Sequence, residues 1–160
     1  MASGRVKQYR AYVDTSVFGG TQDKEFREAS TSFFQKVSKG HFRVLIPPFV
    51  LDELKTAPKA VQQVLDSVPG DLLELIAADD QVKQLAKAYL AAGILTKKST
   101  ADAHHVAAAT IAKADLIVSW NFKHIVNFDR IKKFNGINLI EGYGIIDIRS
   151  PLEVADVKDR

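Results

Sequence analysis

Three carboxylates and one amide stand at positions from which they could share a metal ion. Asp14, Glu53 and Asp102 are acids, and Asn121 offers an amide oxygen. Oxygen ligands of this kind suit hard cations such as Mg²⁺ or Mn²⁺, and the absence of Cys argues against a zinc site. A metal held by carboxylates typically activates water for phosphoryl chemistry. The first expectation is therefore a Mg²⁺ or Mn²⁺ site that acts on a phosphate ester.

Asp14 and Glu53 each have a structural interpretation beside the chemical one. Asp14 closes an apolar run, and at that position an Asx turn or a helix N-cap explains it as well as a role as metal ligand does. Glu53 falls between Phe49 and Val50 on a helical projection, inside the apolar face of the helix expected over residues 49–56. A carboxylate that faces a core requires a cation or a donor, and a salt bridge would also satisfy it.

Asp102 and Asn121 leave the same choice open. Asp102 lies near the start of a helix expected from Ser99, and Ser99-x-x-Asp102 fits a capping box. Asn121 directly follows an apolar strand, where Asn is also an ordinary turn residue. Taken together, the four positions put three carboxylates and an amide at one edge of a sheet, and such a group is unstable without a cation.

An alternation of strands and helices would position these residues. The pattern predicts strands at Arg10–Asp14, Phe42–Ile46 and Leu116–Trp120, with further strands at Ile137–Ile140 and Ile145–Ile148. It predicts helices at Lys24–Lys39, Phe49–Thr56, Lys59–Ser67, Asp79–Ala92 and Ser99–Ala114. This order predicts an α/β fold, a three-layer α/β/α sandwich around a mainly parallel sheet. In open sheets of this kind, ligands bind beyond the carboxyl ends of the strands.

Composition sets the wider limits. A chain of 160 residues makes one domain, with 46% hydrophobic and 26% charged residues, as in soluble globular chains. The net charge of +3 permits a nucleic-acid partner without requiring one. No segment is long and apolar enough to span a bilayer or to act as a secretory signal, so we expect a cytoplasmic protein without a membrane partner. We expect a basic arm over residues 1–8, the domain over 9–150 and a charged tail over 151–160.

Four segments carry a resemblance to a known family. YVDTS at 12–16, LDEL at 51–54, DAHHVAAA at 102–109 and DLIVSWNFKHI at 115–125 resemble the PIN domain, in the branch of VapC-type toxins of toxin–antitoxin pairs. The resemblance implies a PIN-like fold and a Mg²⁺- or Mn²⁺-dependent ribonuclease. It places the acids of the family's cluster at Asp14, Glu53 and Asp102. The family usually has a fourth acid where this chain reads Ser119-Trp120-Asn121.

Further residues lie close to these motifs and could support the site or touch the substrate. Those expected in such roles are Thr15, Ser16, His105, Ser119, Lys123 and His124. His105 is one turn from Asp102 and is also interpretable as a packed core histidine. Lys123 and His124 could meet an RNA backbone or form a solvated basic loop.

The function expected is a metal-dependent endoribonuclease, the toxin of a type II toxin–antitoxin pair. Asp14, Glu53, Asp102 and Asn121 would be catalytic, and the partners would be RNA and a cognate antitoxin. The alternative is a PIN-like RNA-binding or assembly module with little catalysis, because Asn121 replaces an acid. A phosphatase or phospho-acceptor of the haloacid dehalogenase or receiver type is disfavoured, because position 16 is Ser and no acid pair lies near the first strand.

A homodimer is also expected from the sequence. Its basis is the resemblance together with apolar residues on the shorter helices, namely Val61, Val64, Leu65, Leu85, Tyr89 and Leu90.

Overall fold

Five parallel strands form one sheet in the order β3-β2-β1-β4-β5. The strands are β1 Tyr9–Val13, β2 Phe42–Ile46, β3 Leu73–Leu75, β4 Leu116–Val118 and β5 Asp147–Arg149. These elements belong to a computed structural model, in which residues 7–155 are described. Residues 1–6 of the expected basic arm and residues 156–160 of the expected charged tail therefore lie outside the described residues.

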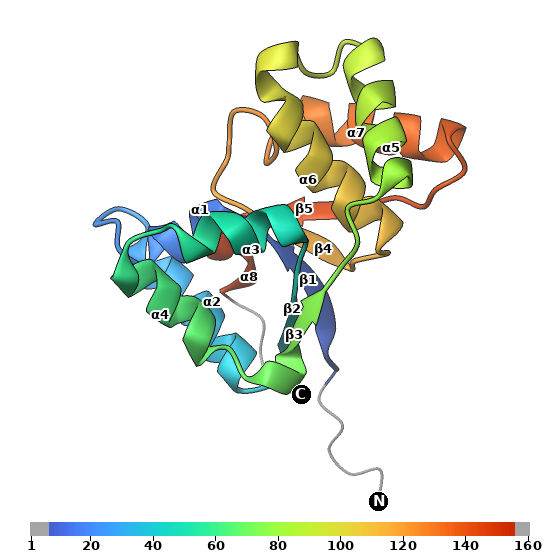
Figure 1. The fold of residues 1–160 in the computed structure, drawn as a ribbon. Coiled ribbons are helices and arrows are strands. Elements are labelled where there is room, and N and C mark those ends of the chain that lie inside the picture. Colours follow the sequence, from blue (N-terminus) through green and yellow to red (C-terminus); the bar gives the residue numbers. More distant parts are fainter. Residues whose placement is uncertain (1–6, 156–160) are drawn as a thin grey trace, which may run out of the picture.

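Helices cover both faces of this sheet. They are α1 Thr15–Gly20, α2 Arg27–Ser38, α3 Pro48–Lys55, α4 Lys59–Ser67, α5 Asp80–Ala91, α6 Thr100–Ile111, α7 Phe128–Ile140 and α8 Pro151–Val154, with 3₁₀ turns η1 Gly70–Leu72 and η2 Lys97–Ser99. Figure 1 shows α5, α6 and α7 grouped on one side of the sheet and the other helices on the opposite side. The predicted three-layer α/β/α architecture with a parallel sheet is confirmed. Within residues 7–155, no helix has the length and apolarity needed to cross a membrane.

The central strands are apolar on both faces because both faces are covered. In β1, Ala11 and Val13 join the core under α1, α2 and α4, whereas Tyr12 joins the core under α5 and α6. In β4, Ile117 points to the same side as Tyr12, and all three residues of the strand are buried. Burial on both faces is typical of parallel strands and explains their continuous hydrophobic runs.

The chain winds in two directions from the middle of the sheet. The connections from β1 to β2 and from β2 to β3 run through α1 to α4, and those from β3 to β4 and from β4 to β5 run through α5, α6 and α7. The reversal occurs between β1 and β4, which pair in register with Val13 opposite Val118. Such a switch point is where open α/β sheets bind ligands. The residues after these two strands, Asp14 and Ser119, therefore lie side by side.

One predicted strand is wrong. Residues Ile137–Ile140 are not a strand, because they form the last turn of α7. Asn127 caps the start of that helix by accepting a hydrogen bond from the Arg130 amide at 3.2 Å. Phe134 lies on the side of the helix that faces the core and is buried there. The two β-branched residues, Ile137 and Ile140, favour a strand locally, but the packing of the helix face overrides that preference.

Other elements differ from the expectation in smaller ways. The strand expected at 145–148 is β5 over Asp147–Arg149, while β3 and α1 had no counterpart in the sequence pattern. Residues 151–154, expected to begin the charged tail, form α8, in which Pro151 and Val154 are buried. A capping box between Ser150 and Glu153 starts this short helix.

Candidate active site

Asp14 lies at the start of α1 and is buried, with 4% of its surface exposed. Its Oδ1 accepts a hydrogen bond from the Ser16 amide at 3.0 Å and another from the Ser16 hydroxyl. Its Oδ2 accepts from the Ser119 hydroxyl at 2.5 Å, a bond that spans β1 and β4. Asp14 is thus both the N-cap of α1 and a carboxylate fixed at the switch point. The two interpretations left open by the sequence are compatible.

Burial raises the pKa of Asp14 above its ordinary value, and this effect outweighs the opposing influences of His105, Ser119 and Ser16. The pKa of Tyr12 is also raised, first by burial and then by the negative charges of Asp14 and Glu53. Both carboxylates therefore act on the same buried hydroxyl.

Glu53 lies on α3 and is exposed. The expectation that it faces the core was wrong, because Val50 and Leu54 carry the buried face of this short helix. Its Oε2 accepts a hydrogen bond from the Thr15 hydroxyl at 2.9 Å. Glu53 therefore borders the site from the solvent side, held by the residue that follows Asp14.

Asp102 lies in the first turn of α6, and its side chain does not cap that helix. Ser99 occupies the N-cap position, but its hydroxyl pairs with Nδ1 of His124 and does not cap the helix, so the capping box suggested by the sequence is absent. Asp102 Oδ1 accepts from the Asn121 side-chain amide at 3.1 Å, and Oδ2 lies 2.9 Å from Nδ1 of His124. The carboxylate is aimed at the loop after β4.

Both the oxygen and the nitrogen of the Asn121 side-chain amide are hydrogen-bonded. Its Oδ1 accepts from the His124 backbone amide at 3.0 Å, while its Nδ2 holds Asp102. Its own backbone amide donates to the Ser119 hydroxyl at 3.0 Å. A continuous series of hydrogen bonds therefore runs from Asp14 through Ser119 and Asn121 to Asp102. The Asn121 oxygen, expected to ligate a cation, is engaged with the backbone instead.

The remaining predicted residues divide into buried and exposed groups. Ser16 accepts from the Trp120 amide at 3.0 Å while donating to Asp14. His105 is buried, and its Nδ1 is 2.7 Å from the Tyr12 hydroxyl. Lys123 is exposed, and His124 is half-buried against Asp102. His105 is thus a packed histidine beside Asp14, and Lys123 is accessible to a ligand.

The donor chemistry suits Mg²⁺ or Mn²⁺, but the ligands are not gathered around one point. Within residues 7–155, no three His, Asp or Glu side chains lie together in a way that could hold a metal ion. The carboxylates are instead paired with hydroxyls, an amide and a histidine. A cation would replace some of these hydrogen bonds or be held partly through water, as Mg²⁺ commonly is.

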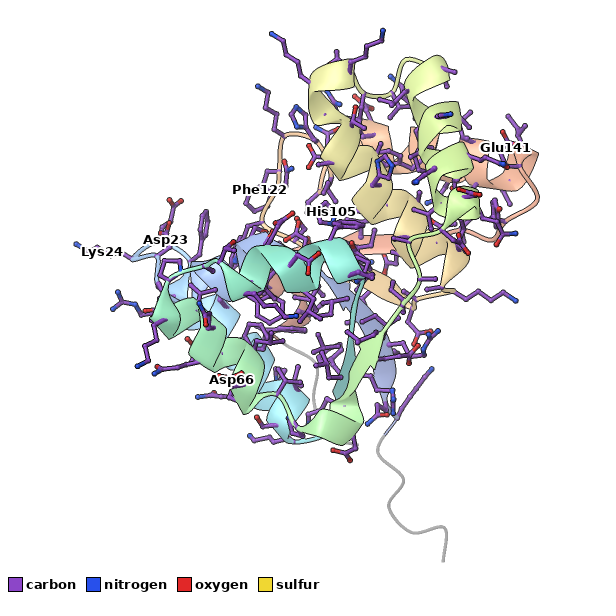
Figure 2. The ribbon with its side chains drawn as sticks, in the orientation of Figure 1. Asp23, Lys24, Asp66, His105, Phe122 and Glu141 are labelled. Carbon is purple, nitrogen blue, oxygen red and sulfur yellow. The ribbon has the colours of Figure 1, made fainter. Side chains whose placement is uncertain are left out.

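Two contributors to this edge were missed from the sequence. Tyr12 supplies the hydroxyl that holds His105, and the signal was a polar atom in the middle of an otherwise apolar strand. Phe122 is 48% exposed directly after Asn121, and the signal was a large apolar residue in a polar loop. Figure 2 labels His105 and Phe122, which lie where the two helical layers meet.

Comparison with known proteins places the fold. The chain resembles the structure of VapBC2 from Rickettsia felis bound to a DNA fragment from its promoter, with TM-score 0.56 and 17% identity over 88% of this chain and 98% of that one. The likeness is one of fold. FitAcB from Neisseria gonorrhoeae has TM-score 0.56 and 12% identity over 89% and 98% of the two chains. A toxin–antitoxin complex from Klebsiella pneumoniae has TM-score 0.53 and 15% identity over 71% and 88%.

The family assignment made from the sequence was wrong. No family model matches the chain, and no curated protein matches it in sequence. The three solved structures named above are 12% to 17% identical to this chain, a level at which the likeness shows the fold alone. Short motifs at strand ends recur wherever a parallel sheet places polar residues at its carboxyl edge, so they do not by themselves establish a family.

Proposed function

We propose that this protein is a metal-dependent endoribonuclease and the toxin of a toxin–antitoxin pair. The observation that carries the proposal is the hydrogen-bonded series from Asp14 to Asp102 across the switch point of the sheet. Glu53 borders the same edge, and its charge acts with that of Asp14 on Tyr12. An acidic edge at this place is suited to binding a cation and to acting on a phosphodiester.

Asp14, Glu53 and Asp102 would hold Mg²⁺ or Mn²⁺ in this proposal. When bound, the metal supplies an activated water and neutralises the charge that develops on the phosphate. The protein's own residues position the carboxylates: Ser119 and Ser16 fix the oxygens of Asp14, and Asn121 orients Asp102. Lys123, exposed in the loop after Asn121, would attract the RNA backbone, an attraction that salt weakens.

The toxin part of the proposal rests on the shared fold. A chain of a toxin–antitoxin complex from Klebsiella pneumoniae and one of VapBC2 from Rickettsia felis have this architecture. We infer a cognate antitoxin as the protein partner. Expression of this chain alone should arrest bacterial growth, and co-expression with the cognate antitoxin should relieve the arrest. Growth unaffected by the chain alone would contradict the toxin proposal.

The homodimer stays a prediction, and its expected basis requires correction. Val61, Leu85 and Tyr89 are buried within the protomer, because they form its core, so they supply no surface for a partner. The apolar residues that are strongly exposed near one another in sequence are Leu139 and Ile140 at the end of α7 and Ile145 in the following loop.

A binding or assembly module with little catalysis is the second candidate. It is favoured by the engagement of the Asn121 oxygen with the backbone and by the lack, within residues 7–155, of a ready group of three metal-ligating side chains. The two candidates differ in whether a divalent cation makes the protein cleave RNA.

One experiment separates these candidates. Wild type, Asp14→Asn and Asp66→Asn are incubated with a mixed RNA substrate in Mn²⁺ or in EDTA. Asp66 is exposed on α4, which Figure 2 shows well away from His105, so it controls for loss of one negative charge. We expect Mn²⁺-dependent cleavage by wild type and Asp66→Asn, and none by Asp14→Asn. Absence of metal-dependent cleavage by wild type would favour the binding module.

A further inference from the structure

Phe122 is a large aromatic side chain presented to solvent at the edge of the candidate active site. It is 48% exposed and directly follows Asn121, which holds Asp102. Its neighbour on the other side is the exposed Lys123. Figure 2 shows Phe122 on the loop that leads from β4 toward α7. An exposed aromatic ring between the amide of Asn121 and the ammonium of Lys123 is suited to contact a ligand.

The loop that carries Phe122 is firmly held. The Phe122 amide donates to the Trp120 carbonyl at 2.9 Å, and the amides of Ile125 and Val126 donate to the Asn121 carbonyl at 3.1 and 2.8 Å. Together with the side-chain bonds of Asn121, these bonds fix the turn on both sides of the ring. The ring is therefore presented without the entropy cost of ordering a mobile loop.

Aromatic rings back Phe122 from within the protein. Its ring meets that of Trp120 edge-on, with centroids 6.0 Å apart, and Trp120 stacks on Phe26 at 4.2 Å. Trp120 is anchored in turn by a hydrogen bond from Nε1 to the Ser30 hydroxyl at 2.8 Å. One edge of the Phe122 ring is thus supported by a rigid stack, while nearly half of its surface remains open.

We propose that Phe122 is a stacking platform for one unpaired base of single-stranded RNA, with Lys123 set to meet the adjoining phosphate. This inference rests on the proposed ribonuclease function, of which it names the substrate class. A base stacks on an aromatic ring only when it is unpaired, and stacking tolerates any base because each has a π face. Duplex RNA keeps its bases inside the helix and would gain nothing from Phe122.

The surroundings of Phe122 fit a nucleic acid better than a protein. Protein docking sites are contiguous apolar patches, whereas Trp120, the ring that Phe122 contacts, is buried, and the sequence neighbours Asn121 and Lys123 are polar and cationic. Phe128, the other strongly exposed Phe in the described part of the chain, differs because the Lys132 ammonium lies 4.6 Å from its ring centroid. It therefore serves as a matched control.

The test measures binding in EDTA, so that it does not depend on cleavage. A fluorescein-labelled six-nucleotide RNA, free of self-pairing, is titrated with wild type, Phe122→Leu, Phe122→Tyr and Phe128→Leu, and anisotropy is recorded. Loss of stacking on one base should weaken binding by Phe122→Leu about tenfold. Phe122→Tyr keeps a ring and should bind as wild type does, and so should Phe128→Leu. The same strand paired in a duplex should bind all four proteins alike.

The single tryptophan gives a second readout. Trp120 contacts Phe122 directly, so the unlabelled hexanucleotide should change Trp fluorescence of wild type and leave that of Phe122→Leu nearly unchanged. Equal affinity of Phe122→Leu and wild type, or equal loss in Phe128→Leu, overturns the inference. Weak binding by Phe122→Leu without any metal-dependent cleavage by wild type supports the stacking site and overturns the ribonuclease proposal instead.

Discussion

The side-chain amide of Asn121 donates a hydrogen bond to the carboxylate of Asp102, with Nδ2 and Oδ1 3.1 Å apart. This contact joins the loop after β4 to the first turn of α6, two segments that the sequence separates by most of a helix and a strand. It also explains why Asp102 does not cap its own helix: its oxygens are turned toward Asn121 and His124. The geometry makes Asn121 a residue that orients an acid.

Replacing Asn121 by Asp should turn the attractive hydrogen bond to Asp102 into a repulsion between two carboxylates. Asn121→Asp brings a second carboxylate against Asp102, so like-charge repulsion should lower the free energy of unfolding of the metal-free protein by about 1 kcal/mol or more, and its melting temperature with it. A divalent cation neutralises the pair, so Mn²⁺ should raise the melting temperature of the variant more than that of wild type. Thermal unfolding with and without Mn²⁺ measures both effects.

Asn127→Asp is the matched control for that change. Asn127 caps α7 by accepting from the Arg130 amide, and Asp is as good an N-cap as Asn. This variant adds the same charge six positions away and should show no extra response to Mn²⁺. If the two variants respond to Mn²⁺ alike, the site at Asp102 does not bind the cation.

Asp14→Asn should not destabilise the metal-free protein. Burial disfavours the charged carboxylate and raises its pKa, whereas Asn carries no charge and remains a good N-cap for α1. Because a raised pKa in the folded state means that the native protein holds its proton more tightly, wild type should gain stability as pH falls toward that pKa. The variant should lack this gain. Melting curves in EDTA between neutral and mildly acidic pH report it, and a lower melting temperature for Asp14→Asn at neutral pH would indicate a structural role.

The packing around Gly20 leaves no room for a side chain at this position. An added Cβ would lie 2.5 Å from the Ser30 hydroxyl oxygen and 2.8 Å from Nε1 of Trp120, atoms that are hydrogen-bonded to each other in the core. Gly20→Ala should therefore lower the free energy of unfolding by about 1–3 kcal/mol. At Gly19 an added Cβ meets nothing within 4 Å, so Gly19→Ala should be neutral or stabilising by up to about 1 kcal/mol. Urea unfolding of both variants gives the comparison, and equal stabilities would show that the core around Trp120 yields to the methyl group.

The ion pair between Arg10 and Glu74 ties β1 to β3 and should make stability depend on pH. Hydrogen bonds from Arg10 lower the pKa of Glu74 below its ordinary value near 4.5. A lowered pKa contributes stability that is present above the ordinary value and is lost as pH falls through the folded one. Glu74→Gln should therefore cost up to about 1 kcal/mol at pH 7, since the pair is partly exposed, and less at pH 3, below the ordinary value near 4.5.

Glu25→Gln, at an exposed position, controls for the loss of a surface carboxylate. Its free energy of unfolding should follow that of wild type at both pH values. A cost for Glu74→Gln that is the same at pH 7 and pH 3 would show that the carboxylate contributes through packing rather than charge.

Local patterns determined the backbone of this fold. The apolar runs of β1, β2 and β4 predicted strands buried on both faces, and Gly40 and Gly93 marked the ends of α2 and α5. Both glycines have positive φ values, of 86° and 75°, which residues with a side chain rarely adopt. Strand and helix periodicity and glycine's conformational freedom act within a few residues, so they are legible in the sequence. The order of those elements also placed Asp14 and Asn121 at the carboxyl edge.

Tertiary packing decided the rest. The residues near Asp102 in the sequence do not determine that its side chain bonds to Asn121 instead of capping its own helix. Nor do local residues determine that Ile137–Ile140 form a helical turn. Both outcomes depend on surfaces brought together from distant segments. The same holds for Glu53, which periodicity placed on a buried face and the short α3 leaves exposed beside Thr15. Sequence fixes which residues can reach the switch point. Hydrogen bonding among distant residues fixes which oxygens remain for a ligand, because a buried polar group takes whichever partner the fold brings within reach.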